Sequence, residues 1–212
     1  MPRISELLEL ATRVLCDPAP LAAVPSAYLF AQTEDNQSSV LAAGSALLRG
    51  EQVAELRLPG CQEMGGYPGS AAWRQALQAL QVPPGQVAEL PLDTSAGLNT
   101  KVEAEALVRH ARALGEGALV VVAAPFHQLR AYMTVVRVLL AEHPQLRVYS
   151  HPGQPLPWGE RARHSQGSLR ATRARLIGRE LERIERYTAS GDLIPVRQVL
   201  GYLDRRDGKT AS

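Results

Sequence analysis

The stretch ALVVVAAPFHQLRAYM, residues 118–133, decides the fold that we expect for this chain. Its first half is apolar and lacks the polar alternation of a half-exposed strand, which is typical of a parallel strand covered on both faces. Its second half places Leu129, Tyr132 and Met133 at helical spacing. A buried strand that runs directly into an amphipathic helix is the first part of a β–α–β unit. We therefore expect residues 118–125 to form the central strand of a parallel sheet.

Four further apolar segments of strand length alternate with helix-length amphipathic segments on both sides of this stretch. They lie at residues 27–32, 52–58, 86–92 and 146–150. This alternation predicts an α/β fold of the Rossmann-like kind, with about five mainly parallel strands in three α/β/α layers. We expect a single domain over residues 1–212, with its core at about 25–150.

The two ends of the chain predict helices around this core. Residues 3–16 carry Glu6, Glu9 and Arg13 within an apolar pattern, which predicts a helix and not a signal peptide. Residues 167–206 predict a helical extension, in which an apolar stripe includes Leu169, Ile177 and Ile184, and which could form a homodimer surface. The proline- and glycine-rich residues 151–167 show no period, and we expect an irregular excursion there.

Composition excludes several classes of protein. The 212 residues carry a net charge of only +2, which is too balanced for the dense basic surface of a nucleic-acid-binding protein. The two cysteines have no spacing typical of a disulfide framework or a zinc site, and a reducing cytoplasm fits this use. No apolar run is long enough to span a bilayer. We therefore expect a cytoplasmic protein whose partner is a small molecule.

Polar residues gather where the predicted strands end. In open parallel sheets the ligand crevice lies beyond the carboxyl ends of the strands, so these loops supply the candidates. The candidate ligand-binding and catalytic residues are Gln32, Gly65, Gly66, Asp93, Asn99, Thr100, His127 and Arg130. We expect these residues to converge on one crevice, with Asp93 and His127 as the catalytic pair and the others in ligand binding.

Arg130 carries the strongest physical argument among these residues. We place it in the first turn of the helix that follows residues 118–125, where a cation opposes the positive end of the helix dipole at a cost of about 0.3–1 kcal/mol. A negative partner would offset this cost. That partner is either Asp93 or Glu34 in a permanent ion pair, or the phosphate or carboxylate of a ligand.

The sequence TKVE, residues 100–103, matches a capping box, with Thr100 as the N-cap and Glu103 reaching back to it. This motif explains both residues structurally. Ser70 similarly predicts the N-cap of a helix after the glycine-rich loop GCQEMGGYPG. That loop does not match a known phosphate-binding motif and is a weak signal by itself.

Three segments together resemble the YdcF/SanA/ElyC-like family of bacterial proteins, a domain family of unknown function. They are the glycine loop before SAAWRQAL, the segment DTSAGLNTKVEA and the segment APFHQLRA, and the resemblance covers about residues 27–150. It implies a three-layer Rossmann-like fold with a pocket at the strand ends, for which Asp93, Asn99, His127 and Arg130 are the matching positions. It also implies S-adenosylmethionine as one conceivable nucleotide-like ligand.

Two hypotheses about function follow. In the first, the protein is a hydrolase or group transferase acting on a phosphorylated or otherwise anionic small molecule. Arg130 then holds the anion, His127 is the general acid or base, and Asp93 orients it or activates water. In the second, the same pocket binds a nucleotide-like ligand such as S-adenosylmethionine without turnover. We assign no metal site, because Asp93 and His127 have only a loose third ligand in Glu34 or Asp35.

Overall fold

The computed structural model describes residues 3–20, 22–164 and 168–208, and it contains one sheet of five parallel strands. The strands are β1 (Val24–Leu29), β2 (Val53–Gly60), β3 (Val87–Pro91), β4 (Ala118–Val122) and β5 (Arg147–Ser150), in the order β3-β2-β1-β4-β5. The predicted α/β class and parallel sheet are therefore confirmed. One prediction about the sheet is wrong: the central strand is β1 and not β4. The more apolar β4 lies between β1 and the edge strand β5.

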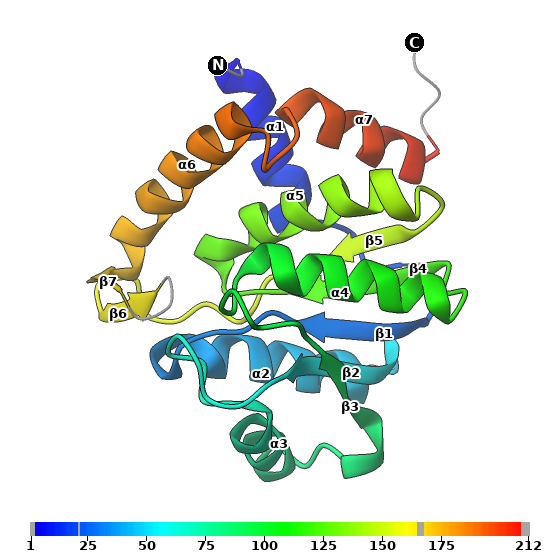
Figure 1. Cartoon of the computed structure of the whole chain (residues 1–212), viewed down its shortest axis with the longest axis vertical. Coiled ribbons are helices and arrows are strands. Elements are labelled where there is room, and N and C mark those ends of the chain that lie inside the picture. Colours follow the sequence, from blue (N-terminus) through cyan, green and yellow to red (C-terminus); the bar gives the residue numbers. More distant parts are fainter. Residues whose placement is uncertain (1–2, 21, 165–167, 209–212) are drawn as a thin grey trace.

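Helices cover both faces of the sheet, as Figure 1 shows. Helices α2 (Glu34–Arg49) and α3 (Ser70–Ala79) pack on one face, where Ala27 and Leu29 of β1 point. Helices α4 (Thr100–Ala113) and α5 (Pro125–Glu142) pack on the other face against Tyr28. This alternation follows from the two-residue period of a strand, and it produces the three expected layers.

The order of the strands creates a switch point between β1 and β4. From β1 the chain moves through β2 to the β3 edge, whereas β4 leads in the opposite direction to the β5 edge. Leu29 pairs with Val122, so the two strands end at the same level. Because α2 leaves from one strand and α5 from the other on opposite faces, the ends of these strands stay open to a ligand.

The ends of the chain form a further layer outside α5 (Figure 1). This layer contains α1 (Ile4–Leu15), α6 (Arg173–Ser190) and α7 (Val196–Arg206). Ile184 of α6 is buried against α5, so the apolar side of α6 serves the core of the same chain, and Ile177 is left 43% exposed. The predicted N-terminal helix and C-terminal helical extension are confirmed, whereas a homodimer through these helices stays a prediction.

One part of the predicted excursion is regular. Strand β6 (Arg161–His164) pairs antiparallel with β7 (Leu169–Thr172), and this hairpin leads directly into α6. Leu169 therefore belongs to a strand and not to the helical stripe. The prediction failed here because four-residue strands are too short to show a period.

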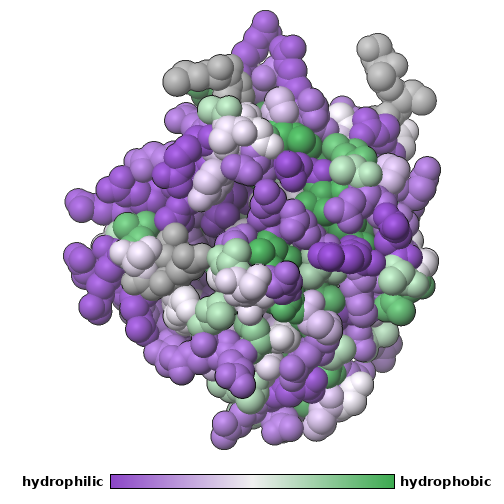
Figure 2. All heavy atoms as spheres, in the orientation of Figure 1, coloured by the Kyte–Doolittle hydropathy of each residue, from purple (hydrophilic) through white to green (hydrophobic). Residues whose placement is uncertain are grey.

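On the face shown in Figure 2, hydrophilic residues dominate and apolar residues form small separate patches.

A buried ion pair ties the C-terminal layer to the sheet. Asp17 and Arg206 form two hydrogen bonds of 2.6 Å, and each side chain is 1% exposed. The same carboxylate accepts the N–H of Ser150 at the end of β5, and Arg206 donates to the carbonyl of Val148. Segments from both ends of the chain and an edge strand therefore meet at one set of hydrogen bonds.

We predict that Asp17→Asn lowers the free energy of unfolding by about 3–5 kcal/mol, because it removes the buried counter-charge of the Arg206 guanidinium and leaves only the partly exposed Asp207 as its ionic partner. Urea unfolding followed by circular dichroism measures this change. The control is Asp204→Asn, which removes an ion pair of Arg13 with a partner that is 44% exposed, and which should cost less than about 1 kcal/mol. Equal effects of the two substitutions would contradict the anchoring role of Asp17.

Candidate functional site

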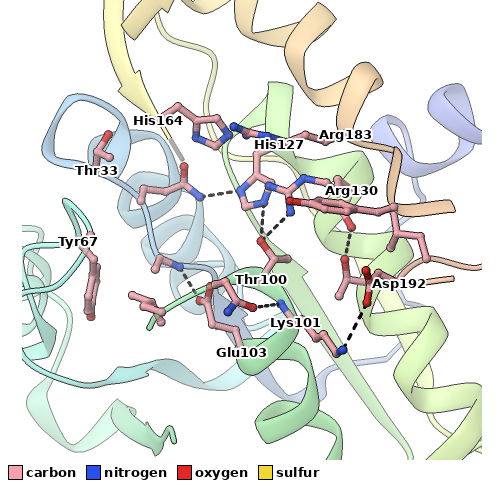
Figure 3. A pocket seen from close by; sticks show the side chains of 18 residues that line it. Thr33, Tyr67, Thr100, Lys101, Glu103, His127, Arg130, His164, Arg183 and Asp192 are labelled. Atoms are coloured by element: carbon pink, nitrogen blue, oxygen red, sulfur yellow. Dashed lines mark hydrogen bonds and ion pairs between the residues drawn. The ribbon is translucent and has the colours of Figure 1, made fainter. Parts of the chain in front are cut away.

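A cavity of about 400 Å³ opens at the carboxyl ends of the strands, at the switch point. Its walls come from the loops after β1 and β2, the start of α4, the first three turns of α5, the end of β6, and α6 with the loop that follows it (Figure 3). The residues that line it are Ala31, Gln32, Thr33, Gly65, Tyr67, Leu98, Asn99, Thr100, Lys101, Glu103, His127, Arg130, Thr134, His164, Arg183, Tyr187, Asp192 and Leu193. Six of the eight predicted site residues are among them.

The two exceptions are Asp93 and Gly66, which do not line the cavity. Asp93 is exposed, and its carboxylate accepts the N–H of Ser95 in its own loop. The structure therefore does not bring the predicted catalytic aspartate to His127. The glycine loop contributes Gly65, while Gly69, with φ of 95°, is the N-cap that we had assigned to Ser70.

His127 lies at the centre of a hydrogen-bonded chain. Its Nδ1 is 3.2 Å from Nε2 of Gln32, and its Nε2 is 3.2 Å from the hydroxyl oxygen of Thr100. Because the Gln32 amide nitrogen donates, Nδ1 must accept, and the imidazole carries its proton on Nε2. His127 therefore donates to Thr100 and orients that hydroxyl group in the cavity.

The surroundings of His127 keep it neutral. The ring is 4% exposed, and burial followed by the charge of Arg130 holds its pKa well below the ordinary imidazole value. A general base needs a free nitrogen and a pKa near the working pH. Both nitrogens of His127 already have partners, so the geometry favours a positioning role over the acid–base role that we expected from the sequence.

Arg130 forms its ion pair with a residue that the sequence did not indicate. Its Nε donates to Oε2 of Glu180 in α6 at 2.5 Å, and its Nη1 donates to the Thr100 hydroxyl at 3.0 Å. The predicted pair with Asp93 or Glu34 is therefore wrong. Arg130 also lies in the second turn of α5, which begins at Pro125, so the penalty expected from the helix dipole is smaller than we argued.

Glu180 of α6 is the residue that connects the C-terminal layer to the site, and we call it the hub because three side chains donate to it. Its side chain is 3% exposed and also accepts from His164 at 2.8 Å and from Arg183 at 2.6 Å. Burial alone would raise the pKa of this carboxyl, but Arg130 and His164 outweigh burial and hold it well below its usual range. The carboxylate stays ionised, and it fixes one edge of the Arg130 guanidinium.

A signal for Glu180 exists in the sequence. Leu176, Glu180 and Ile184 are spaced by four residues, so the glutamate lies on the buried stripe of its own helix. A charged residue on such a stripe needs a buried partner. The sequence does not reveal that this partner is Arg130, which lies fifty positions earlier in the chain.

Glu103 does not form the predicted capping box. The N-cap of α4 is Asn99, whose side chain accepts the N–H groups of Lys101 and Val102. Glu103 is 2% exposed, and its Oε1 accepts the N–H of Ala31 and the hydroxyl of Tyr28. Burial raises the pKa of Glu103 to about 7, although both donors and Arg130 act against this shift.

Metal ligands do not assemble in the described ranges. Among the residues that the structure describes, no group of three or more His, Cys, Asp or Glu side chains is arranged to hold a metal ion. Glu34 and Asp35, which were the conceivable third ligands, pair with Arg163 of β6.

Comparisons with protein-family models, with curated proteins and with solved structures returned no significant match to this chain. The resemblance to the YdcF/SanA/ElyC-like family therefore stays a prediction. Within the described part of the chain, none of the helices has both the length and the apolar composition needed to cross a membrane.

We predict that Glu180→Gln lowers the free energy of unfolding by about 3–5 kcal/mol, because it removes the counter-charge of the buried Arg130. The matched control is Glu182→Gln on the same helix, where Glu182 is 63% exposed and pairs with Arg179. This control should change stability by less than about 1 kcal/mol. Chemical unfolding of both variants tests the prediction, and a small effect of Glu180→Gln would contradict the role of the hub.

A second prediction concerns pH. The native pKa of Glu103, about 7, lies above that of an unfolded glutamate, so the native state binds the extra proton and loses stability as pH rises from about 4.5 to 7. Glu103→Gln removes this loss. Its stability relative to wild type should therefore increase by about 2–3 kcal/mol between about pH 5 and pH 8. Glu105→Gln, on the same helix but outside the cavity lining, is the control; a pH-independent difference for Glu103→Gln would contradict the raised pKa.

Proposed function

We propose that this cavity binds a phosphorylated or otherwise anionic small molecule, and that the protein is a hydrolase or group transferase acting on it. The observation that carries the proposal is the unused donor capacity of Arg130 inside the cavity. A guanidinium has five N–H donors. Three of them are directed to Glu180 and Thr100, and the remaining two have no acceptor among the described residues.

Other positive groups surround the same space. Lys101 and Arg183 line the cavity and approach it from α4 and α6 (Figure 3). The N-termini of α2 and α4 also reach it, through Thr33 and Asn99. The positive ends of helix dipoles favour an anion at such a place.

Two of the negative groups near this space are already paired, and the third, Glu103, is neutral below its pKa of about 7. Glu180 already accepts from three cationic or imidazole side chains, and Asp192 interacts with Lys101 at 3.5 Å near the mouth, where both side chains are about half exposed. Because the ion pairs leave donor groups of Arg130 unused, an incoming phosphate or carboxylate can bind without displacing Glu180.

The size of the cavity and one buried acceptor narrow the ligand further. A volume of about 400 Å³ is within the range that holds a metabolite. Gln32 is 3% exposed, and its Oε1 has no hydrogen-bond partner among the described residues. A ligand that carries a hydroxyl or amino group beside its anionic group would satisfy this oxygen. Phosphorylated sugars and nucleotides have that combination.

The enzymatic part of the proposal is supported by the concentration of perturbed titratable groups. The pKa values of Glu103, His127 and His164, which line the cavity, and of Glu180, which pairs with Arg130, all differ from their usual values. Such clusters are typical of active sites, although structural ion-pair networks also produce them. The alternative is a binding module for a nucleotide-like ligand such as S-adenosylmethionine, and turnover separates the two.

We predict that sulfate stabilises the wild-type protein against heat, and that Arg130→Gln combined with Glu180→Gln weakens sulfate binding by about tenfold or more. The double substitution removes both charges of the Arg130–Glu180 pair, and the charge it leaves without its partner is that of Arg183, whose side chain is 15% exposed. The matched control is Arg179→Gln with Glu182→Gln, an exposed pair on α6 outside the cavity lining. Calorimetric titration with sulfate measures the affinities. Equal affinities of the two double variants would show that the anion site lies elsewhere.

Turnover is tested by incubating the protein with a panel of phosphate monoesters, including nucleoside monophosphates, and with S-adenosylmethionine. The proposal expects a product from at least one phosphate monoester, and loss of that product in the Arg130→Gln, Glu180→Gln variant. Tight binding of S-adenosylmethionine with no product from any compound would favour the binding module.

A further inference from the structure

We propose that Glu103 is the residue that exchanges a proton with the bound anionic molecule, through its Oε2 atom. This assignment rests on the proposed function of the cavity, and it names the acid–base group of that function. The sequence suggested His127 for this role and explained Glu103 as a cap. The geometry reverses the two: His127 positions a hydroxyl, and Glu103 has the free atom.

The two carboxyl oxygens of Glu103 have different surroundings. Oε1 accepts from the N–H of Ala31 at 2.8 Å and from the hydroxyl of Tyr28 at 3.1 Å. No described residue donates a hydrogen bond to Oε2, although the side chain lines the cavity. Because two donors occupy Oε1, a proton on this carboxyl resides on Oε2, from which it can be given to a ligand.

The fixed position of Glu103 suits a catalytic group. One donor to Oε1 is a backbone N–H directly after the central strand, and the other is a fully buried tyrosine of that strand. The carboxyl is therefore held by rigid elements and not by a mobile loop. Glu103 follows Thr100 by three positions on α4, so both polar groups lie on the same side of the helix.

The titratable groups that face Glu103 from neighbouring elements are three groups that are neutral near pH 7 and one cation. Tyr28 of β1, Cys61 after β2 and Tyr67 of the glycine loop all interact with it electrostatically. Burial is the largest cause that raises the pKa of each of these three groups, and the charge of Glu103 acts in the same direction. The pKa of Cys61 rises to about 11. All three groups are therefore neutral near pH 7. Arg130 is the cation that acts on Glu103 from α5.

These surroundings allow both protonation states to be populated near neutral pH. Burial raises the pKa of Glu103 to about 7, whereas His127 and His164 titrate below the usual imidazole range because they are buried. An acid–base catalyst works best when its pKa lies near the pH of the reaction. At neutral pH, Glu103 therefore meets this condition better than either histidine.

The proton balance of a hydrolysis is complete with water as the co-reactant. The carboxylate takes a proton from water at Oε2 while the water oxygen forms its bond to the phosphorus or carbonyl carbon of the transferred group. Oε2 then gives this proton to the leaving oxygen as the bond between that oxygen and the transferred group breaks. Glu103 ends in its initial state, and Arg130 stabilises the negative charge that develops.

The experiment measures sulfate affinity as a function of pH, because sulfate keeps the same charge between about pH 5.5 and pH 8.5 while Glu103 titrates. Wild type should bind sulfate about tenfold more weakly at the upper end, since an ionised Glu103 repels the anion. Glu103→Gln should bind with an affinity that does not depend on pH in this range. Glu105→Gln should follow wild type.

The outcomes separate this proposal from the one on which it rests. If Glu103→Gln keeps the pH dependence of wild type, Glu103 is not the proton-exchanging group, although the anion site stands. If wild type binds no sulfate at any pH, the anion site fails first. The infrared band of the protonated carboxyl then tests Glu103 without a ligand: it should disappear with a midpoint near pH 7 and be absent in Glu103→Gln. A midpoint in the ordinary carboxyl range would overturn the proposal.

Discussion

The ion pair between Arg130 and Glu180 is the interaction on which the candidate site depends. It joins α5, which leaves the sheet at the switch point, to α6 in the C-terminal layer. Both side chains are almost completely buried, so removing either partner is expected to destabilise the fold strongly. The pair therefore has two consequences. It holds α6 over the ends of the strands, and it fixes the guanidinium while leaving two of its N–H donors unused in the cavity.

Two carboxyl groups that interact with Arg130 have different surroundings. On one side, Glu180 is permanently ionised because it accepts from Arg130, His164 and Arg183. On the other side, Glu103 is near the midpoint of its titration at neutral pH, because burial raises its pKa to about 7 against the effect of its two hydrogen-bond donors. Glu103 in the cavity lining and Glu180, which pairs with Arg130, thus have opposite pKa shifts, a pattern that assigns different roles to similar groups. Glu180 organises the cations, and Glu103 remains able to change its charge.

The sheet was predictable from the sequence, because buried parallel strands are continuous apolar runs that alternate with helices. The convergence of Gln32, Thr100, His127 and Arg130 was also predictable, since the rule for strand ends needs only the topology. The role of Glu180 could not be predicted, because helical spacing shows that a glutamate is buried but not which distant residue neutralises its charge. Glu103 was misinterpreted, because Thr-x-x-Glu matches a capping box whether the glutamate turns toward its own helix end or toward Ala31 in the loop after β1. Local patterns do not distinguish the two cases.

The central claim is that the Arg130 guanidinium, held by Glu180, presents free donors to an anion at the switch point. Nitrogen NMR of the arginine side chains during a sulfate titration tests it most directly, because each guanidinium reports its own contacts. The account predicts that the Arg130 signals shift in a saturable manner, with smaller changes at Arg183, while exposed arginines such as Arg179 do not saturate. Unchanged Arg130 signals at sulfate concentrations that stabilise the protein would contradict it.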